Sequence, residues 1–365
     1  MGKNIEETLS QMDAEEISVI VGGMFDNATT TVVEWDCELL KGGYTEGAYR
    51  VFGRAQVDGE IRPWSVILKV PSPIASVGGF PEREGTVLAD SYVDSIPCRI
   101  HTPRCYGFTS GGENLDWIWM EEVEDAERGQ WSREILFDAA GALAQFNYAS
   151  TLQDRWPDWP WIREECQLRE FIVRFGVDER ELTEALDRWT TRGLDPSFAA
   201  RMLQLHADRE RYLDFLDTLP ACISHGDADR RNLLYHPGKS GARSIVAIDW
   251  ALSGRSVLGD DSQNLVNGSV VWGQFDLDDI EKLDEIAFSG YVAGLRDSGW
   301  EGDEGEIRLG HVISSALKWG LTLGSVAATR TFPDPTDEQV HFIHRFLVHT
   351  LGHADEGELL LRQLG

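Results

Sequence analysis

The sequence has few basic residues, and it contains no hydrophobic run long enough to cross a membrane. Its 365 residues include 33 lysines and arginines against 62 aspartates and glutamates, which gives a net charge of −29. Proteins bind nucleic acids and anionic membranes through a basic footprint, so this charge argues against both partners. A membrane-spanning helix needs about 20 consecutive apolar residues, and no stretch approaches that length. We therefore expect neither nucleic acid nor membrane among the partners.

Cysteine is also scarce. The five cysteines, at positions 37, 98, 105, 166 and 222, are odd in number and widely spaced. No two have the spacing of a metal site, and disulfides are rare in the cytosol. We therefore expect reduced thiols in a cytoplasmic protein, as a monomer or homodimer.

The acidic surplus itself has two interpretations. It indicates either a solvated, self-repelling surface or an acidic cleft that attracts a cationic substrate. Composition alone does not decide between them.

The distribution of strand and helix patterns divides the chain into two parts. Strand patterns dominate up to Val123, at 29–35, 48–57, 64–70, 104–108 and 115–120, with helices at 13–22 and 82–93. Beyond Val123 the pattern is mainly helical, at 132–150, 162–175, 179–190, 197–217, 260–274, 278–296, 305–328 and 337–350. Short strands are expected around 222–235 and 244–250. The sequence predicts an α+β fold with a β-rich lobe over residues 1–122 and a larger, mainly helical lobe over 123–365.

The most informative stretch lies around His225. Asp227 follows His-Gly, Asn232 comes five positions later, and Asp249 ends an apolar run seventeen positions after that. Phosphoryl transfer from a nucleoside triphosphate requires one carboxylate to orient a hydroxyl, and an amide with a second carboxylate to hold Mg²⁺. Each residue alone fits an ordinary turn. Together they predict Asp227 as the catalytic base and Asn232 and Asp249 as the metal ligands of a small-molecule kinase.

The pattern His-Gly-Asp-x-x-x-x-Asn followed by Ile-Asp-Trp resembles that of the aminoglycoside phosphotransferase and choline kinase family. The resemblance covers roughly residues 30–330. It implies the two-lobed protein-kinase-like fold, ATP or GTP as phosphate donor, Mg²⁺, and a small-molecule acceptor. His225 itself could serve as a base, but we expect a structural role, in which the hydrogen bonds of its ring brace the loop and Asp249.

Lys69 interrupts an apolar strand, where a charged side chain requires a counter-charge or a polar cleft. The resemblance implies that Lys69 contacts the nucleotide phosphates and pairs with a helix carboxylate. Glu84 is the preferred partner and Glu82 the alternative. An exposed edge strand would explain Lys69 without function.

Two weaker features complete the resemblance to the nucleotide site. Gly42, Gly43 and Thr45 resemble the glycine-containing loop whose backbone N–H groups approach phosphate. The backbone around Glu121 to Val123 resembles the hinge that binds the purine base.

Two positions depart from the family pattern. Asn147 replaces a histidine near the end of the long helix at 132–150. Asn264 replaces the second aspartate of Gly-Asp-x-x-x-Asp-Leu, which puts the bracing of the catalytic loop in doubt.

Two aromatic or histidine-rich stretches are not part of that pattern. The tryptophan-rich tract 155–165 falls where the family builds its acceptor pocket, but it would equally pack as a plug into the helical lobe. The histidines His341, His344, His349 and His353 lie on a late helix, where helical spacing separates them too widely for one ion. We expect them to be incidental.

The favoured function is therefore an antibiotic-kinase-like O-phosphotransferase with an aminoglycoside as acceptor. A macrolide, a choline-like amine, homoserine or a sugar are alternative acceptors. A non-catalytic, kinase-like binding protein is less favoured, because Lys69, Asp227, Asn232 and Asp249 are all present. A protein kinase is disfavoured, since Asp229 stands where its catalytic loop has lysine.

Overall fold

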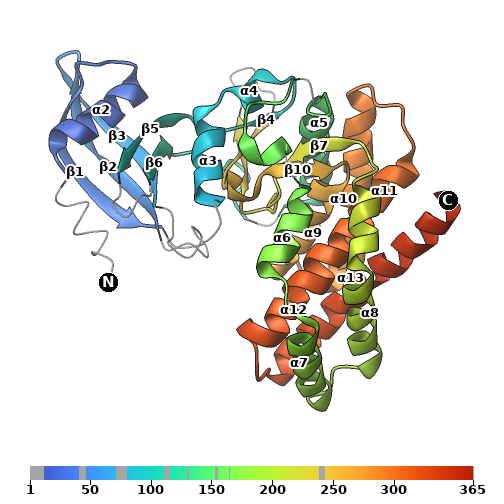
Figure 1. Ribbon diagram of the computed structural model, residues 1–365. Helices are drawn as coiled ribbons and strands as arrows, with labels where there is room; N and C mark the ends of the chain where they lie inside the picture. The colour runs from blue at the N-terminus through green and yellow to red at the C-terminus, as the bar shows by residue number, and fades with distance from the viewer. Residues whose placement is uncertain are drawn as a thin grey trace. The chain divides into compact units, whose positions relative to one another are not determined.

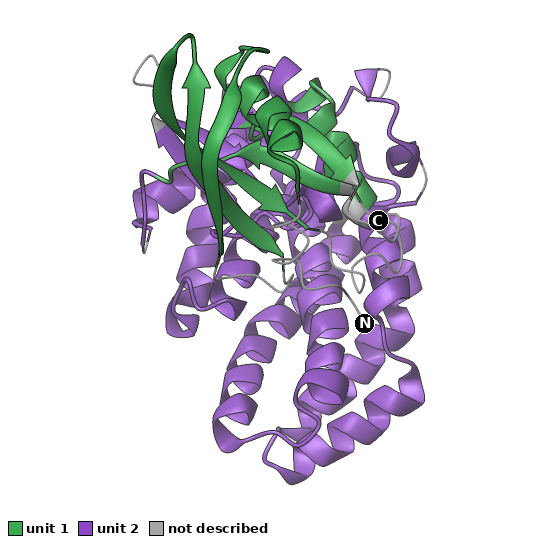
Figure 2. Cartoon of the chain, turned by 90° about the vertical axis from the view of Figure 1, so that its left-hand side faces the viewer, with its two compact units in different colours: residues 1–93, 101–125 green, residues 94–100, 126–365 purple. Residues whose placement is uncertain are grey.

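The chain forms two compact units, which Figure 2 shows in different colours. The computed structural model describes residues 12–40, 47–70, 80–110, 116–129, 131–152, 155–163, 165–237 and 243–364. Unit 1 comprises residues 1–93 and 101–125, and unit 2 comprises 94–100 and 126–365.

Unit 1 is built on a five-stranded antiparallel sheet (Figure 1). The strands, in sheet order, are β1 (Thr31–Leu39), β2 (Ala48–Val57), β3 (Glu60–Lys69), β6 (Asp116–Glu121) and β5 (Cys105–Ser110). A tight turn joins β2 to β3, because Asp58 and Gly59 both adopt a positive φ, of 52° and 84°. This is the Asp-Gly conformation that matches the twist of a hairpin. The expected strands of the first lobe are thus all present.

Helix α2 (Ala14–Phe25) packs against this sheet. Asp13 caps its N-terminus by accepting a hydrogen bond from the Glu15 N–H at 3.1 Å. Its apolar face, with Ile17 and Val21, joins the strand side chains in one core, which also includes Trp119. The single helix expected at 82–93 is two helices, α3 (Phe80–Ala89) and α4 (Tyr92–Ser95). Unit 1 is therefore a sheet with a core of its own.

Unit 2 is mainly helical. Its helices are α5 (Arg133–Ala149), α6 (Gln167–Phe175), α7 (Glu179–Thr191), α8 (Pro196–Leu216), α9 (Asp260–Val271), α10 (Ile280–Asp297), α11 (Glu304–Ser315), α12 (Gly324–Val326) and α13 (Asp337–Leu364). Its short strands are β7 (Ala221–Ser224), β8 (Leu233–Pro237), β9 (Arg243–Ala247) and β10 (Gly254–Val257), together with β4 (Ile100–His101), of which Ile100 belongs to this unit. They are ordered β10-β7 and β4-β9-β8. These strands flank the His225 stretch, as the sequence predicts.

Helices α5 and α10 approach each other closely because both carry glycine at the contact. A Cβ atom on Gly290 would lie 2.3 Å from the Phe137 carbonyl oxygen, and one on Gly294 would lie 2.3 Å from that of Gly141. No larger residue fits at either position without separating the helices. The close contact holds α5, which carries Asn147, firmly within unit 2.

The last third of the chain differs from its prediction. The helix expected at 305–328 changes to π-helical geometry at η5 (Ala316–Leu323) and again at η6 (Ala327–Thr331). Helix α13 does not end near residue 350 but continues to Leu364. π-helical turns are rare, and they frequently occur at functional sites.

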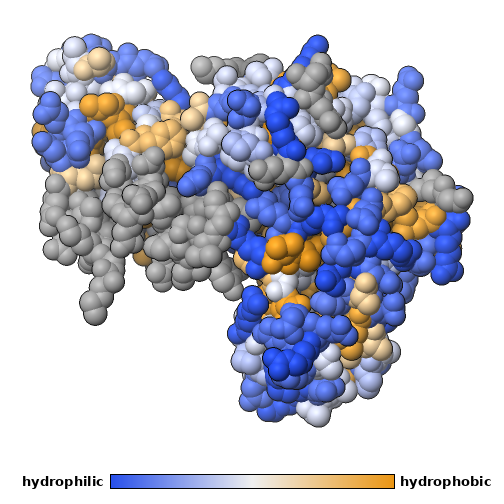
Figure 3. Space-filling view, in the orientation of Figure 1, coloured by the Kyte–Doolittle hydropathy of each residue, from blue (hydrophilic) through white to orange (hydrophobic). Residues whose placement is uncertain are grey.

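The face of unit 2 seen in Figure 3 is mostly hydrophilic, with small separate hydrophobic areas. Within the described ranges, no helix combines the length and the apolar character that a membrane crossing needs.

Candidate active site

The loop after β7 carries the signature residues in unit 2. Gly226 has a φ of +78°, and a Cβ atom there would lie 2.0 Å from the Leu252 carbonyl oxygen. Glycine is therefore required both for the left-handed backbone and for the space. The turn that it permits places Asp227 directly after the buried end of the strand.

Asp227 and Asn232 are brought together as the spacing predicts. The Asn232 side-chain amide donates to the Asp227 carbonyl oxygen at 2.8 Å and to its carboxylate at 3.0 Å. These bonds use the nitrogen of the amide, so its oxygen is the atom suited to a metal ion. Asn232 thus also orients the carboxylate of Asp227.

The surroundings of Asp227 alter its acidity. Burial raises the pKa of its carboxyl to about 7, and the negative charges of Asp229 and Asp249 act in the same direction. The positive charges of Lys318 and Arg231 oppose this rise. A carboxylate with a pKa near the working pH can accept a proton and release it again.

Asp249 follows β9 immediately before a short 3₁₀ helix, η3 (Trp250–Leu252). Its φ and ψ of 64° and 60° place it in the left-handed region, which is uncommon for a residue with a side chain. Such backbone strain is concentrated at functional sites. The Ile248 N–H donates to the Asn232 carbonyl oxygen at 2.9 Å, so Asp249 directly follows a residue bonded to the Asn232 loop.

His225 has the structural role that the sequence analysis favours. Its Nε2 lies 3.0 Å from the Ile248 carbonyl oxygen, and its Nδ1 accepts a hydrogen bond from the Asp227 N–H at 3.2 Å. The ring therefore connects the backbone of Asp227 to the segment that leads to Asp249.

Asp261 braces the loop. Its carboxylate accepts hydrogen bonds from the backbone N–H groups of His225 at 2.9 Å and Gly226 at 3.0 Å, and from the Asn147 amide at 2.8 Å. Burial, with the neighbouring Asp260, raises the pKa of Asp261 to about 6, while the three hydrogen bonds lower it. The doubt about bracing is thus resolved: Asn264 accepts from the Trp319 indole instead, at 3.2 Å.

Asn147 has a place in the same network. It donates to the Ile223 carbonyl oxygen at 2.9 Å and accepts from the Tyr291 hydroxyl at 2.8 Å. Because it also binds Asp261, it links helix α5 to the carboxylate that holds the loop. The departure from histidine at this position therefore leaves the loop fully supported.

Lys318 is a residue of this site that the sequence analysis missed. It lies in the π-helical segment η5, its side chain is almost fully buried, and its ammonium donates to the Gly226 carbonyl oxygen. The ammonium also lies 5.2 Å from the centre of the Phe171 ring. One signal was available, because Lys318 interrupts the apolar run Ala316–Leu321 as Lys69 interrupts β3.

In unit 1, Lys69 and Glu84 form the ion pair that the sequence predicts. The Lys69 ammonium lies 2.6 Å from the Glu84 carboxylate, and the side chains are 15% and 3% exposed. Glu82, the alternative partner, is exposed. Lys69 ends β3, which is an interior strand of the sheet, so the edge-strand explanation is wrong.

The other residues that the sequence analysis assigns to the nucleotide lie in two segments. Gly42, Gly43 and Thr45 lie outside the described residues. The Glu121 N–H donates to the Arg104 carbonyl oxygen at 2.9 Å. A purine that binds this segment therefore needs its donor from a later residue, such as Val123.

The tryptophan tract packs largely inward. Trp156 and Trp159 are buried, and the Trp156 indole donates to the Ser150 carbonyl oxygen at 2.5 Å. Trp161 is partly exposed and stacks on Trp159, with ring centres 5.7 Å apart. Two of the three rings thus fill the core of unit 2.

Comparison with known proteins agrees with this geometry. The model of the phosphotransferase enzyme family matches residues 65–273. No curated protein matches the sequence. Over half of the chain, including Lys69, Asp227, Asn232 and Asp249, falls within the match to the family model.

Solved structures share the fold at low identity. A choline kinase from Cryptosporidium parvum is 12% identical, with 95% of this chain and 96% of that chain covered and a TM-score of 0.55. An amicoumacin kinase is 13% identical, with 95% of each chain covered and a TM-score of 0.52. An ethanolamine kinase from Plasmodium vivax is 14% identical, with 87% and 81% covered and a TM-score of 0.50. The chain has this α+β, kinase-like fold, and it belongs to the phosphotransferase enzyme family.

Proposed function

We propose that this protein transfers a phosphoryl group from ATP or GTP to a hydroxyl group of a small molecule, with Mg²⁺ as cofactor. The observation that carries the proposal is the paired arrangement of Asp227 and Asn232 after a tight glycine turn. There the pKa of the Asp227 carboxyl is raised to about 7. The transition state of phosphoryl transfer is loose, so the protein accelerates the reaction mainly by orienting the reactants and stabilising charge, with little covalent chemistry of its own.

Asp227 acts as the base in this proposal. It holds the acceptor hydroxyl in line with the γ-phosphorus and accepts its proton as the new oxygen–phosphorus bond forms, while the bond to the bridging oxygen breaks and the nucleoside diphosphate leaves. Asn232 fixes the rotation of that carboxylate. The amide oxygen of Asn232 and the carboxylate of Asp249 are hard oxygen ligands that fit Mg²⁺. When bound, Mg²⁺ supplies positive charge to the phosphate oxygens.

Unit 1 supplies the groups for the nucleotide. Lys69, whose ammonium lies 2.6 Å from the Glu84 carboxylate, is proposed to contact the phosphate oxygens, since an ammonium is a compact positive charge with three donors. The glycine loop with Gly42, Gly43 and Thr45 would add backbone donors, and the segment from Glu121 to Val123 would bind the purine.

The acceptor is proposed to be an amine-bearing alcohol, with an aminoglycoside favoured. The net charge of −29 favours a cationic ligand. Two proteins that share the fold are named for amino-alcohol acceptors, choline and ethanolamine. A macrolide, homoserine or a sugar is the alternative acceptor in the same class of reaction.

A nucleotide-consumption assay against a panel of aminoglycosides, amino alcohols, macrolides, homoserine and sugars tests the proposal. We expect at least one amine-bearing alcohol to stimulate Mg²⁺-dependent ATP or GTP consumption, with phosphate recovered on the acceptor. The Lys69→Met variant is the control and should show none of this stimulation. Stimulation by no member of the panel, together with no slow nucleotide hydrolysis, would favour a non-catalytic binding protein.

The Lys318→Met variant should shift the pH dependence of the reaction. The positive charge of Lys318 lowers the pKa of Asp227, which burial raises to about 7. Removing that charge raises the pKa further, so less of the base is ionised on the acid side. We expect activity at pH 6 to fall at least about threefold more than activity at pH 8.5.

The matched control for this prediction is Lys282→Met, which removes an exposed lysine from helix α10. Its pH–rate profile should overlay that of the wild type. An equal loss at every pH in Lys318→Met would show that the lysine only supports the loop.

A further inference from the structure

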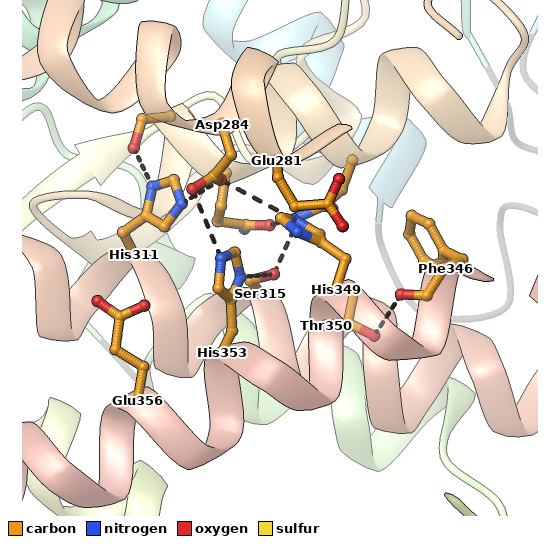
Figure 4. Close-up of polar contacts among 12 residues, drawn as sticks. Glu281, Asp284, His311, Ser315, Phe346, His349, Thr350, His353 and Glu356 are labelled. Atoms are coloured by element: carbon orange, nitrogen blue, oxygen red, sulfur yellow. Dashed lines mark hydrogen bonds and ion pairs between the residues drawn. The ribbon is translucent and has the colours of Figure 1, made fainter. Parts of the chain in front are cut away.

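Three helices of unit 2 bring four polar side chains to one buried point, which we call the histidine cluster. Its members are Asp284 on α10, His311 on α11, and His349 and His353 on α13 (Figure 4). Their side chains are only 0–7% exposed. The sequence analysis expected the histidines of α13 to be incidental, and for His349 and His353 that is wrong. The spacing argument considered one helix, whereas the side chains that meet in the cluster come from three.

The ring nitrogens of the cluster face one carboxylate. Nε2 of His311 lies 2.7 Å from one Asp284 oxygen, and Nε2 of His353 lies 3.5 Å from the other. Nε2 of His349 lies 4.0 Å from the first oxygen. Zinc binds histidine nitrogen at about 2.0–2.1 Å, so tetrahedral ligand atoms lie about 3.3 Å apart. The ligand atoms of Asp284, His311 and His353 all lie within 4.8 Å of one another, and His349 approaches the same carboxylate.

His349 supplies the observation that points to a ligand. Its Nε2 is buried and has no hydrogen-bond partner among the described residues. Burial lowers the pKa of His349 to about 3, so its ring is neutral and is in the form that binds metals. An unpaired buried polar atom destabilises a fold, because it loses its hydrogen bonds to water without replacement. A bound ion would supply the missing partner.

The outer nitrogens of two rings are held as they are in metal sites. Nδ1 of His311 lies 2.7 Å from the Ser262 hydroxyl, and Nδ1 of His353 lies 2.8 Å from the Ser315 hydroxyl. Such partners fix the ring orientation and the nitrogen that faces the ion. Nε2 of His353 lies 3.5 Å from both the Asp284 carboxylate and the Arg308 guanidinium, so this nitrogen faces the centre of the cluster.

Charge favours an added cation. Arg308 forms ion pairs with Asp284 at 2.9 Å and with Glu356 at 2.8 Å, so two carboxylates face one guanidinium. The carboxylates of Asp284 and Glu356 thus carry two negative charges against the single positive charge of Arg308, and an unbalanced charge is costly in a buried place. A cation in the cluster would compensate this charge.

We propose that Asp284, His311, His349 and His353 bind one transition-metal ion of the zinc class. Three imidazoles and one carboxylate are ligands for Zn²⁺ and Co²⁺, whereas Mg²⁺ prefers oxygen. Four protein ligands leave no open position, so the ion joins α10, α11 and α13 rather than taking part in catalysis. Ser262 follows Asp261, so the ion would also stabilise the helix that braces the catalytic loop. The proposal does not depend on the proposed function.

Titration of the metal-free full-length protein with Co²⁺ tests the proposal. We expect one equivalent to bind, with the visible absorption of four-coordinate Co²⁺, and Zn²⁺ to displace it. Zn²⁺ should also raise the melting temperature. These measurements need no variant, and the absence of both the cobalt spectrum and any metal-dependent change in melting would overturn the proposal.

Variants then locate the ion. Ser315→Ala should lower the affinity for Co²⁺ by about 10–100-fold, and His349→Gln by more. His341→Gln, an exposed histidine on the same helix, is the control and should bind as the wild type does. If the cluster only supports the fold and any metal binds elsewhere, His349→Gln would leave the affinity for Co²⁺ unchanged. Equal binding by all four proteins would indicate an adventitious surface site and would overturn the proposal.

Discussion

Asp227→Asn should reduce the turnover number for phosphate transfer by about 10²–10⁴-fold and leave nucleotide binding nearly unchanged. Asparagine has the size of aspartate, and its side-chain oxygen can keep the hydrogen bond from Asn232, which measures 3.0 Å in the native protein. The backbone bond from residue 227 to His225 is unaffected. The substitution thus removes the proposed proton acceptor and keeps the hydrogen bonds that hold the loop. Steady-state kinetics and calorimetric titration with a nucleotide measure the two effects separately.

The stability of this variant distinguishes lost chemistry from lost fold. The pKa of Asp227 is raised in the folded protein from the ordinary value of about 3.9 to about 7. The stabilisation from its protonated form is therefore present below pH 4 and is lost as pH rises through 7. A neutral asparagine avoids this loss. At pH 8 we expect the variant to be at least as stable as the wild type in denaturant unfolding.

The control for this experiment is Asp297→Asn, which replaces an exposed aspartate at the end of α10. It should retain wild-type turnover. Near wild-type turnover in Asp227→Asn itself would show that the base is another residue. Loss of activity together with a marked loss of stability would show that Asp227 mainly supports the loop.

Local patterns were sufficient to predict much of the fold. Asp13 and Ser132 cap the helices that the sequence places after them, each accepting a backbone N–H. The Asp58–Gly59 turn and the strands around it are likewise set by residues close together in the chain. Lys69 was identifiable because a lysine in an apolar strand requires a counter-charge, and in the structure its ammonium pairs with the Glu84 carboxylate.

Long-range contacts were not predictable in the same way. Lys318 reaches Gly226 across 92 positions, and Asp261 reaches His225 across 36. No spacing rule connects such residues, because the packing of whole helices decides which side chains meet. The family pattern suggested Asn264 as the weak point, but the neighbouring Asp261 carries the bracing bonds. For Lys318, the signal available in the sequence was a charged residue within an apolar helical run.

Long-range contacts also explain why helix α13 is longer than the sequence predicts. Gly352 follows the expected end of α13, yet the helix continues through it. A Cβ atom at Gly352 would meet nothing within 4 Å, so no close packing or turn requires glycine there. The extension brings His353 to the histidine cluster and Glu358 to the Arg211 guanidinium. Tertiary contacts of this kind outweigh the low helix propensity of one glycine.

Asp261→Ala should lower the free energy of unfolding by about 3–5 kcal/mol and remove most of the activity. The change leaves three donors without an acceptor: the backbone N–H groups of His225 and Gly226, and the Asn147 amide. Each unsatisfied buried donor destabilises the protein by about 1–3 kcal/mol, and removal of a buried carboxyl offsets part of this. Because two of the donors precede Asp227 directly, the loop that carries the base should lose its fixed position.

Asp260→Asn is the matched control for this prediction, because Asp260 is buried beside Asp261 but binds Ser256 and Gln263. It should lower stability while leaving the turnover of the folded protein near the wild-type value, since its bonds do not reach the catalytic loop. Denaturant unfolding and turnover, measured where all variants are folded, separate the two effects. If both variants lost activity only in proportion to their loss of stability, Asp261 would contribute to the stability of the core and would have no specific effect on the loop that carries Asp227. A specific loss of turnover in Asp261→Ala would identify it as the residue that positions the base.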